Sequence, residues 1–467
     1  MDVLNFTISD ILNGYKKKDF SVSEIVSSYL ARIEKLNPQI NAFITIDSKN
    51  ARKKAKELDG KDITNTLHGI PIGIKDMFLT KGVKTTASAK LLENYTPPYS
   101  ATTVMRLEEA GAISLGKLNC DAWAHGSSGE NSDFGNTLNP WNFEHVPGGS
   151  SSGSGASVAG SLVPIATGTD TGGSIRLPAS FTNTVGLKPT YGLVSRYGVI
   201  AMASSLDSIG HFSKTVEDSA RILQTTAGHD VYDSTVSKRE KEDYLKGLHE
   251  EIKGLKIGVP KEYITDALNA DIKETFNRSI KILEKLGAEI IELSLPHTEY
   301  AIATYYIIQP SEVSSNLARY DGVRFGHDRS FFGKEAKRRI MLGTFTLSSG
   351  YYDAYYKKAM QARTLIIEDF KKAFTQVDAL IAPICPTPAW KFNEKTNDPL
   401  QMYLSDALTV PMNLAGIPAL SVPAGFSKNR LPIGMQFIGP HFSEKLLFRI
   451  GNNFEKETEY YKQTPNL

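Results

Sequence analysis

Hydrophobic positions with helical and strand spacing alternate along the whole chain. Near the N-terminus, Ser21 and Glu24 have the spacing of a capping box, which predicts a helix start. The helix face that follows is formed by Ile25, Tyr29, Ile33 and Leu36. The apolar run NAFITI (41–46) predicts a short strand, and the charged residues 51–58 predict a solvated helix.

Two later segments predict buried strands. HGIPIGIKDMF predicts a strand that is interrupted by Gly73 and carries Lys75 at its end. VMRLEEAGAISLGKLN predicts a helix that stops near Gly111 and a short strand after it.

The second half of the chain continues this mixture. Residues 272–295 predict a helix, a C-terminal cap at Gly287 and a strand. The buried face of that helix is predicted to contain Phe276, Ile280, Leu283 and Leu286. IPALSVPAG and LPIGMQFIG predict adjacent strands joined by a polar turn around 428–430. Without an internal repeat or a break in composition, the pattern predicts one large α/β domain over residues 1–467, with inserted helical segments.

Composition excludes several classes of protein. A hydrophobic content of 41% with 22% charged residues is typical of a globular protein, and a net charge of +2 gives no overall basic field for nucleic acid. The two cysteines, Cys120 and Cys385, have no metal or redox spacing and fit a reducing cytosol. Since neither a signal peptide nor an apolar run of about 18 to 20 residues is found, we expect a soluble cytoplasmic protein without membrane contact.

Three motifs carry weak signals. Gly111–Leu118 matches a phosphate-binding loop except that Leu118 replaces the magnesium-binding Ser or Thr, and the helix precedes the glycines. The nine histidines show no metal-ligand spacing, so no metal site is expected. GSSSG matches a nucleophile elbow at Ser151, but Pro147 disfavours the strand that an elbow needs.

The Gly/Ser tract VPGGSSSGSGASVAG (146–160) has two interpretations. Such tracts are often flexible linkers, but they also form active-site loops. Here the tract continues into a helix-like apolar stretch, ASVAGSLVPIA, and a second cluster, TDTGGSIRLPAS. Two glycines before Ser174 allow consecutive backbone N–H groups to converge on a carbonyl oxygen, which favours an active site.

The segment GGSSSGSGASVAGSLVPIATGTDTGGSIRLP (148–178) resembles the signature of the amidase signature family. The resemblance implies a mixed β-sheet flanked by helices, with a signature core at about 65–215. It also implies a Ser–cis-Ser–Lys triad formed by Ser174, Ser150 and Lys75. The implied oxyanion hole consists of backbone N–H groups from Thr171, Gly172 and Gly173, extending to Ser174.

The residue types suit amide hydrolysis. A serine hydroxyl attacks an amide only if a base removes its proton, and Lys75 is a base only when neutral. Lowering a lysine pKa from about 10.4 to about 7 costs roughly 4 to 5 kcal/mol, which burial can supply. The apolar IPIGI segment before Lys75 is consistent with such burial.

Further stretches, including SSGENSDFGNTLNPWN and PMNLAGIPALSVPAG, are similar to the glutamine-hydrolysing A subunits of tRNA-dependent amidotransferases. This resemblance implies glutamine as substrate and a substrate-binding part at about 300–440. By motif position, Arg339 would hold the α-carboxylate of glutamine and Asp406 its α-ammonium group. Tyr305 would be a further contact.

The same resemblance implies partners. Ammonia would pass to a GatB-like B subunit, which uses ATP and Mg²⁺ to activate Glu-tRNA(Gln) or Asp-tRNA(Asn) and binds most of the tRNA. A small GatC-like C subunit would complete a heterotrimer, and no cofactor is implied for glutamine hydrolysis itself. Two alternatives stay open: a stand-alone amidase acting on other small amides, and a non-catalytic subunit, which the intact triad disfavours.

Two departures from the family pattern stand out. His125 and Gly129 occupy positions near the implied pocket that more often hold Met and Thr. The stretch at about 325–335 is shorter than usual.

Overall fold

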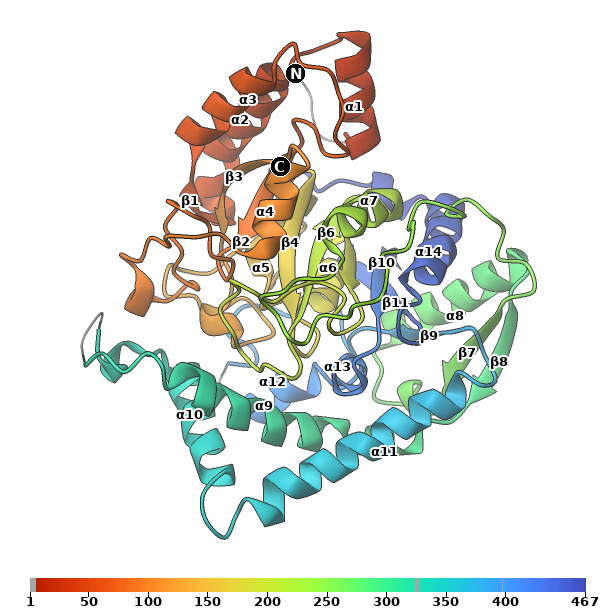
Figure 1. The fold of residues 1–467 in the computed structure, drawn as a ribbon. Helices are drawn as coiled ribbons and strands as arrows, with labels where there is room; N and C mark the ends of the chain where they lie inside the picture. Colours follow the sequence, from red (N-terminus) through yellow and green to blue (C-terminus); the bar gives the residue numbers. More distant parts are fainter. Residues whose placement is uncertain (1–5, 324–326, 397) are drawn as a thin grey trace.

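The computed structural model describes residues 6–323, 327–396 and 398–467. Within these residues one eleven-stranded sheet lies at the centre of the molecule, and helices surround it (Figure 1). The strands are β1 (Phe43–Ile46), β2 (Pro71–Lys75), β3 (Ile113–Leu118), β4 (Ile165–Asp170), β5 (Val185–Lys188), β6 (Ser208–Ser213), β7 (Lys256–Pro260), β8 (Glu289–Leu293), β9 (Ala379–Pro383), β10 (Ala419–Phe426) and β11 (Pro432–Ile438). Their order is β1-β3-β2-β4-β6-β5-β10-β11-β9-β7-β8.

The helices divide into groups around this sheet. The α-helices are α1 (Ile8–Lys17), α2 (Val22–Ile40), α3 (Ser48–Leu58), α4 (Thr102–Glu109), α5 (Ser152–Ala159), α6 (Arg176–Thr182), α7 (Val216–Thr226), α8 (Ala270–Lys285), α9 (Ala301–Leu317), α10 (Lys334–Thr346), α11 (Lys358–Ala373), α12 (Pro399–Leu404), α13 (Val410–Ala415) and α14 (Glu444–Thr458). In Figure 1, α1 to α3 lie at the top of the view, and α9, α10 and α11 lie along the bottom. The predicted single mixed-sheet α/β domain flanked by helices is confirmed.

The sheet combines two parallel regions with an antiparallel centre. Strand β2 is parallel to both β3 and β4, and β7 is parallel to both β8 and β9. Every residue of β2, β3 and β4 is buried, which is usual for parallel strands covered on both faces. Because β2 and β4 are parallel neighbours, their carboxyl ends meet, and Lys75 therefore lies beside the end of β4.

Most predicted elements are present. Ser21 and Glu24 form the capping box of α2, and the predicted face of that helix is buried. In α8, Phe276 and Leu283 are buried, whereas Ile280 and Leu286 are only half-buried. The buried face of α8 is centred slightly away from the predicted one and includes Ile272, Thr275, Phe276, Ser279 and Leu283.

The Gly/Ser tract differs from the prediction. Its second half forms α5, which begins at Ser152, and the apolar residues after it form β4 rather than a continuation of the helix. Close packing explains why α5 contains glycine, which is a poor helix former. A Cβ atom on Gly153 would lie 2.5 Å from the Ala42 carbonyl oxygen, so only glycine fits.

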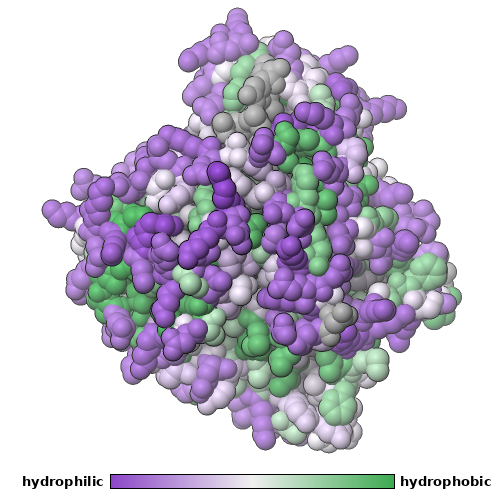
Figure 2. All heavy atoms as spheres, turned by 180° about the vertical axis from the view of Figure 1, so that it is seen from behind, coloured by the Kyte–Doolittle hydropathy of each residue, from purple (hydrophilic) through white to green (hydrophobic). Residues whose placement is uncertain are grey.

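Polar side chains cover most of the face opposite to that in Figure 1, and hydrophobic side chains gather there in separate patches (Figure 2). Among the residues that the structure describes, no helix has the length and apolar character needed to cross a membrane. Residues 324–326 of the shortened stretch lie outside the described residues, and Arg329–Phe331 after them form a 3₁₀ turn.

Candidate active site

The amine of Lys75 is enclosed by three hydroxyl groups. Its Nζ lies 2.9 Å from Ser150 Oγ, 2.9 Å from Ser151 Oγ and 2.7 Å from Thr169 Oγ1. The Lys75 side chain is fully buried, and no carboxylate forms an ion pair with it in the described part of the chain. The fold thus places a lysine in a pocket of neutral oxygens.

This environment perturbs the lysine strongly. Burial lowers the pKa of Lys75 from 10.5 to about 8, because the charged ammonium loses its hydration. Cys120 and the carboxyl groups of Asp121, Asp170 and Asp207 act in the opposite direction and keep the pKa from falling further. The direction agrees with the requirement for a neutral amine.

The two predicted serines come from adjoining loops. The Gly149–Ser150 peptide bond is cis, and the carbonyl of Ser150 accepts a hydrogen bond from Asp121 N–H at 3.0 Å. The N–H of Ser151 donates to the Ser174 carbonyl at 3.3 Å, which joins the two loops. Ser150 is fully buried and Ser174 nearly so, and Ser174 Oγ forms no hydrogen bond with any described residue.

The loop between β4 and α6 contains the predicted oxyanion donors. Thr171, Gly172 and Ser174 donate no backbone hydrogen bond to any residue that the structure describes. Gly173 differs from the prediction, because its N–H donates to Asp170 Oδ1 at 2.9 Å. Its φ of +133° is one that favours glycine, so Gly173 shapes the turn, and its own N–H is occupied by Asp170.

A buried ion pair beneath this loop was not predicted from the sequence. Arg176 Nη2 and Asp170 Oδ1 are 3.0 Å apart, and both side chains are fully buried. Asp170 also accepts hydrogen bonds from the N–H groups of Gly173 and Ile175. These partners outweigh the cost of burial and lower the pKa of Asp170 to about 2. A signal was present, because Asp170 and Arg176 flank the TGGSI turn on either side.

Arg339 and Asp406 come from separate segments of the chain, and both contact Tyr306. Arg339, on α10, is buried; its Nε bonds Glu335 Oε1 at 2.8 Å, and its Nη1 bonds Gln309 Oε1 at 2.7 Å. The Arg339 guanidinium also lies over the Tyr306 ring, 5.5 Å from its centroid. Asp406 follows α12 and is buried as well, so neither residue is a solvated surface charge.

Two polar neighbours of Asp406 were not predicted. Tyr306 Oη donates to Asp406 Oδ2 at 2.7 Å, and Ser127 Oγ donates to the same oxygen at 3.0 Å. Burial outweighs these bonds and raises the pKa of Asp406 to about 6. Tyr305, which was predicted to contact the substrate, lies against the oxyanion loop, where a Cβ on Gly172 would come within 2.6 Å of its hydroxyl.

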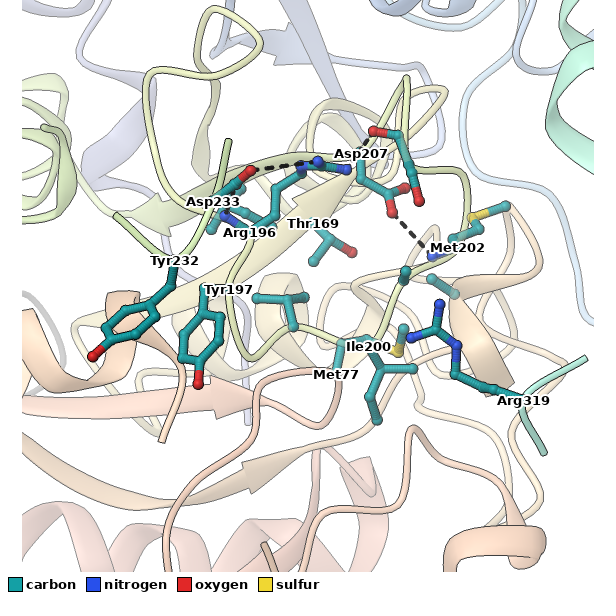
Figure 3. A pocket seen from close by; sticks show the side chains of 15 residues that line it. Met77, Thr169, Arg196, Tyr197, Ile200, Met202, Asp207, Tyr232, Asp233 and Arg319 are labelled. Atoms are coloured by element: carbon teal, nitrogen blue, oxygen red, sulfur yellow. Dashed lines mark hydrogen bonds and ion pairs between the residues drawn. The ribbon is translucent and has the colours of Figure 1, made fainter. Parts of the chain in front are cut away.

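A cavity of about 240 Å³ borders this region (Figure 3). Its wall includes Thr169, which contacts the Lys75 amine, and Asp207, which accepts a hydrogen bond from Thr171. Arg196 and Asp233 form an ion pair of 3.5 Å in another part of the wall (Figure 3). The three residues predicted to bind substrate do not line this cavity.

The weaker motifs lead elsewhere. Gly111–Leu118 forms a turn and the buried strand β3, not a phosphate-binding loop. The described residues contain no group of three or more His, Cys, Asp or Glu side chains that could hold a metal ion. Cys120 and Cys385 are both buried and free.

Comparison with known proteins decides the family. The model of the amidase family matches residues 24–448. The chain belongs to this family. It is 53% identical to the A subunit of the glutamyl-tRNA(Gln) amidotransferase of Geobacillus sp. strain WCH70 and 52% identical to that of Carboxydothermus hydrogenoformans, each over 100% of both chains.

Solved structures agree with this assignment. The A subunit of the glutamyl-tRNA(Gln) amidotransferase of Thermotoga maritima superposes with a TM-score of 0.85 at 43% identity, covering 98% of this chain and 95% of that one. A 6-aminohexanoate cyclic dimer hydrolase superposes with a TM-score of 0.90 at 24% identity, over 100% of this chain and 99% of that one, and shares the fold. The chain is therefore an enzyme of the amidase and amidotransferase type, and the predicted family membership is confirmed.

Proposed function

We propose that this chain is the glutaminase subunit of a tRNA-dependent amidotransferase. The observation that supports amide hydrolysis is the buried amine of Lys75, which lies among three hydroxyls next to the loop of Ser174. The observation that supports glutamine as the substrate is full-length similarity to proteins named as A subunits of glutamyl-tRNA(Gln) amidotransferase. The signature core at about 65–215 supplies the catalytic groups, and residues at about 300–440 supply most substrate contacts.

The proposed reaction begins with proton transfer. Neutral Lys75 accepts a proton from Ser150, Ser150 accepts one from Ser174, and Ser174 Oγ attacks the side-chain amide carbon of glutamine. When the C–N bond breaks, the proton returns through Ser150 to the leaving nitrogen, and ammonia departs. Water then hydrolyses the γ-glutamyl ester of Ser174 by the same relay and releases glutamate.

The hydrogen-bond pattern supports Ser150 rather than Ser151 as the relay. A neutral amine has two N–H groups and one lone pair, so one of its three hydroxyl partners must donate to it. The Ser151 hydroxyl already donates to the Thr169 carbonyl at 3.3 Å, so the proton donated to Lys75 comes from Ser150 or Thr169. The relay also requires a Ser150–Ser174 hydrogen bond, which we expect to form when substrate is bound, as catalytic bonds often tighten in the complex.

We propose that the turn after β4 stabilises the negative charge that develops on the carbonyl oxygen of the substrate. The N–H groups of Thr171, Gly172 and Ser174 would receive the oxyanion, and Gly173 would complete the turn as the residue whose N–H is tied to Asp170. Glutamine would bind with its α-carboxylate on Arg339, its α-ammonium on Asp406 and its chain beside Tyr305.

The partners belong to the same proposal. A B subunit would activate Glu-tRNA(Gln) or Asp-tRNA(Asn) with ATP and Mg²⁺ in the cytoplasm and accept the ammonia, and a C subunit would complete the heterotrimer. The hydrolysis of glutamine itself needs no cofactor in this scheme.

The test is ammonia release from glutamine and from a panel of simple amides, by the full chain alone and with B and C subunits. We expect glutamine to be strongly preferred, turnover to rise with the partners, and Arg339→Ala to raise KM for glutamine at least tenfold. Broad hydrolysis of simple amides by the chain alone would instead favour the stand-alone amidase.

A further inference from the structure

A buried histidine near Arg339 has no role in the scheme above. His125 is 1% exposed, and neither Nδ1 nor Nε2 has a hydrogen-bond partner among the described residues. It follows the short turn Ala122–Ala124 and precedes Ser127, whose hydroxyl reaches Asp406. His125 therefore belongs to the segment that already contributes to the proposed glutamine pocket.

Two hydrogen bonds hold the backbone of the segment that contains His125. Asn131 Nδ2 donates to the His125 carbonyl at 3.0 Å, and Gly149 N–H donates to the Ser127 carbonyl at 2.9 Å. The second bond ties the segment to the residue before Ser150. These bonds fix the position from which the His125 ring extends.

Leaving this ring unsatisfied is costly. A neutral imidazole has one N–H donor and one acceptor nitrogen, and burying either without a partner destabilises the fold. Native structures leave few such groups, and a bound ligand is one way in which they are satisfied. A second unsatisfied donor lies near Arg339, since Gln309 Oε1 is bound to Arg339 Nη1 while Gln309 Nε2 is buried without a partner among the described residues.

The charges near His125 indicate which chemical group of a ligand would bind to its ring. Burial lowers the pKa of the His125 imidazole well below 6.5, and the positive charge of Arg339 acts in the same direction. The ring is thus a neutral donor beside a cation. Arg339 is itself paired with Glu335 at 2.8 Å, so part of its charge is already balanced. A carboxylate bound there would gain from additional neutral donors, because it accepts up to about four hydrogen bonds.

We propose that His125 donates a ring N–H to the α-carboxylate of glutamine that Arg339 binds. The inference rests on the proposed function and adds a specificity residue to it. His125 does not take part in proton transfer in this scheme; it contributes a hydrogen bond that only an α-carboxylate substrate can use.

The test compares ligands with and without that carboxylate. His125→Met fills a similar volume but removes both nitrogens, and the full chain is assayed together with its B and C subunits. A hydrogen bond to a charged group contributes about 1.5 to 3 kcal/mol, so we expect KM for glutamine to rise roughly 10- to 100-fold, with kcat within about twofold. The inhibition constant of 4-aminobutanamide, which is glutamine without its α-carboxylate, should stay within about twofold.

Further variants separate binding from structure. His125→Asn and His125→Gln each retain an N–H near one ring nitrogen, and one of them should recover part of the glutamine affinity. Thr103→Val removes another buried unpartnered oxygen, on α4, and serves as the matched control with unchanged KM.

Three outcomes would overturn the inference. An unchanged KM in His125→Met, with wild-type enzyme active on glutamine, refutes the role of His125 and leaves the proposed function intact. A parallel loss for glutamine and 4-aminobutanamide assigns His125 to packing. A wild-type enzyme that does not hydrolyse glutamine refutes the proposed function and this inference with it.

Discussion

Replacing Arg176 by Met removes the cation that balances a fully buried carboxylate. Arg176 Nε and Nη2 lie 3.1 and 3.0 Å from the two oxygens of Asp170, and the same guanidinium reaches the Thr409 carbonyl, Asn413 and Gln436. The variant keeps the side-chain volume but leaves Asp170 with bonds from backbone N–H groups and Asn413 only.

The expected loss of stability is large at neutral pH. Breaking a buried ion pair by removing one partner costs about 3 to 5 kcal/mol, since the remaining charge stays desolvated. In the wild type, Asp170 has its pKa lowered from 3.8 to about 2, so it stabilises the fold by roughly 2 kcal/mol above pH 4, and this is lost as pH falls from about 4 to 2. Without Arg176, burial raises that pKa instead, and the carboxylate destabilises the fold at neutral pH.

The destabilisation caused by Arg176→Met should depend on pH. We expect the difference in unfolding free energy between wild type and Arg176→Met to be about 3 to 5 kcal/mol at pH 7.5 and to shrink as the pH falls to 4.5, because a protonated Asp170 no longer needs its partner. Urea denaturation followed by circular dichroism at several pH values measures it. Arg221→Met is the matched control: Arg221 forms a partly exposed ion pair with Glu217 at 2.7 Å, and its loss should cost at most about 1 kcal/mol.

Two results would refute this reasoning. A loss below about 1 kcal/mol for Arg176→Met would mean that Asp170 is satisfied without its partner. A large loss that is independent of pH would mean that packing, and not the charge of Asp170, accounts for the effect.

Three shorter predictions concern the site. The kcat/KM for glutamine should rise with pH, reach half its maximum near pH 8 and level off above about pH 9, because only the neutral form of Lys75 accepts a proton and its pKa is about 8; a rate independent of pH between 6 and 9 would exclude Lys75 as the base. Tyr306→Phe should raise KM for glutamine roughly 3- to 10-fold in steady-state assays, because Asp406 loses one hydrogen bond, and an unchanged KM would argue against Asp406 as the ammonium site. Gly172→Ala should reduce kcat at least 100-fold without loss of folding, because the new Cβ would meet the Tyr305 hydroxyl at 2.6 Å, and near wild-type kcat would show that the loop can move freely.

Local sequence signals predicted much of this fold. The capping box at Ser21 indicated the start of α2, and the apolar residues before Lys75 indicated a buried strand that ends at the lysine. Both features depend on neighbouring residues, so one sequence is enough to find them. The start of α5 at Ser152 could not be predicted this way: the apolar stretch from Ala156 indicated a helix, but the Gly/Ser residues before it favour a helix only weakly, and Gly153 lies against the distant Ala42 carbonyl.

In the candidate site too, local patterns were predictable from the sequence and contacts between distant residues were not. The TGGS turn marks a loop of converging N–H groups, but not which N–H the Asp170 carboxylate occupies; the structure gives Gly173 that bond. Likewise, the hydrogen bond from Tyr306 to Asp406 could not be predicted, because the two residues lie far apart in the sequence. The unsatisfied ring of His125 is visible only once its surroundings are known.

The most direct measurement of the central claim is glutamate formation from glutamine by the full chain, with B and C subunits, in the wild type and in Ser174→Ala. The account predicts equal amounts of glutamate and ammonia from the wild type, and at least a thousandfold lower rate from Ser174→Ala with an unchanged fold. Glutamine hydrolysis at near wild-type rate by Ser174→Ala would contradict it.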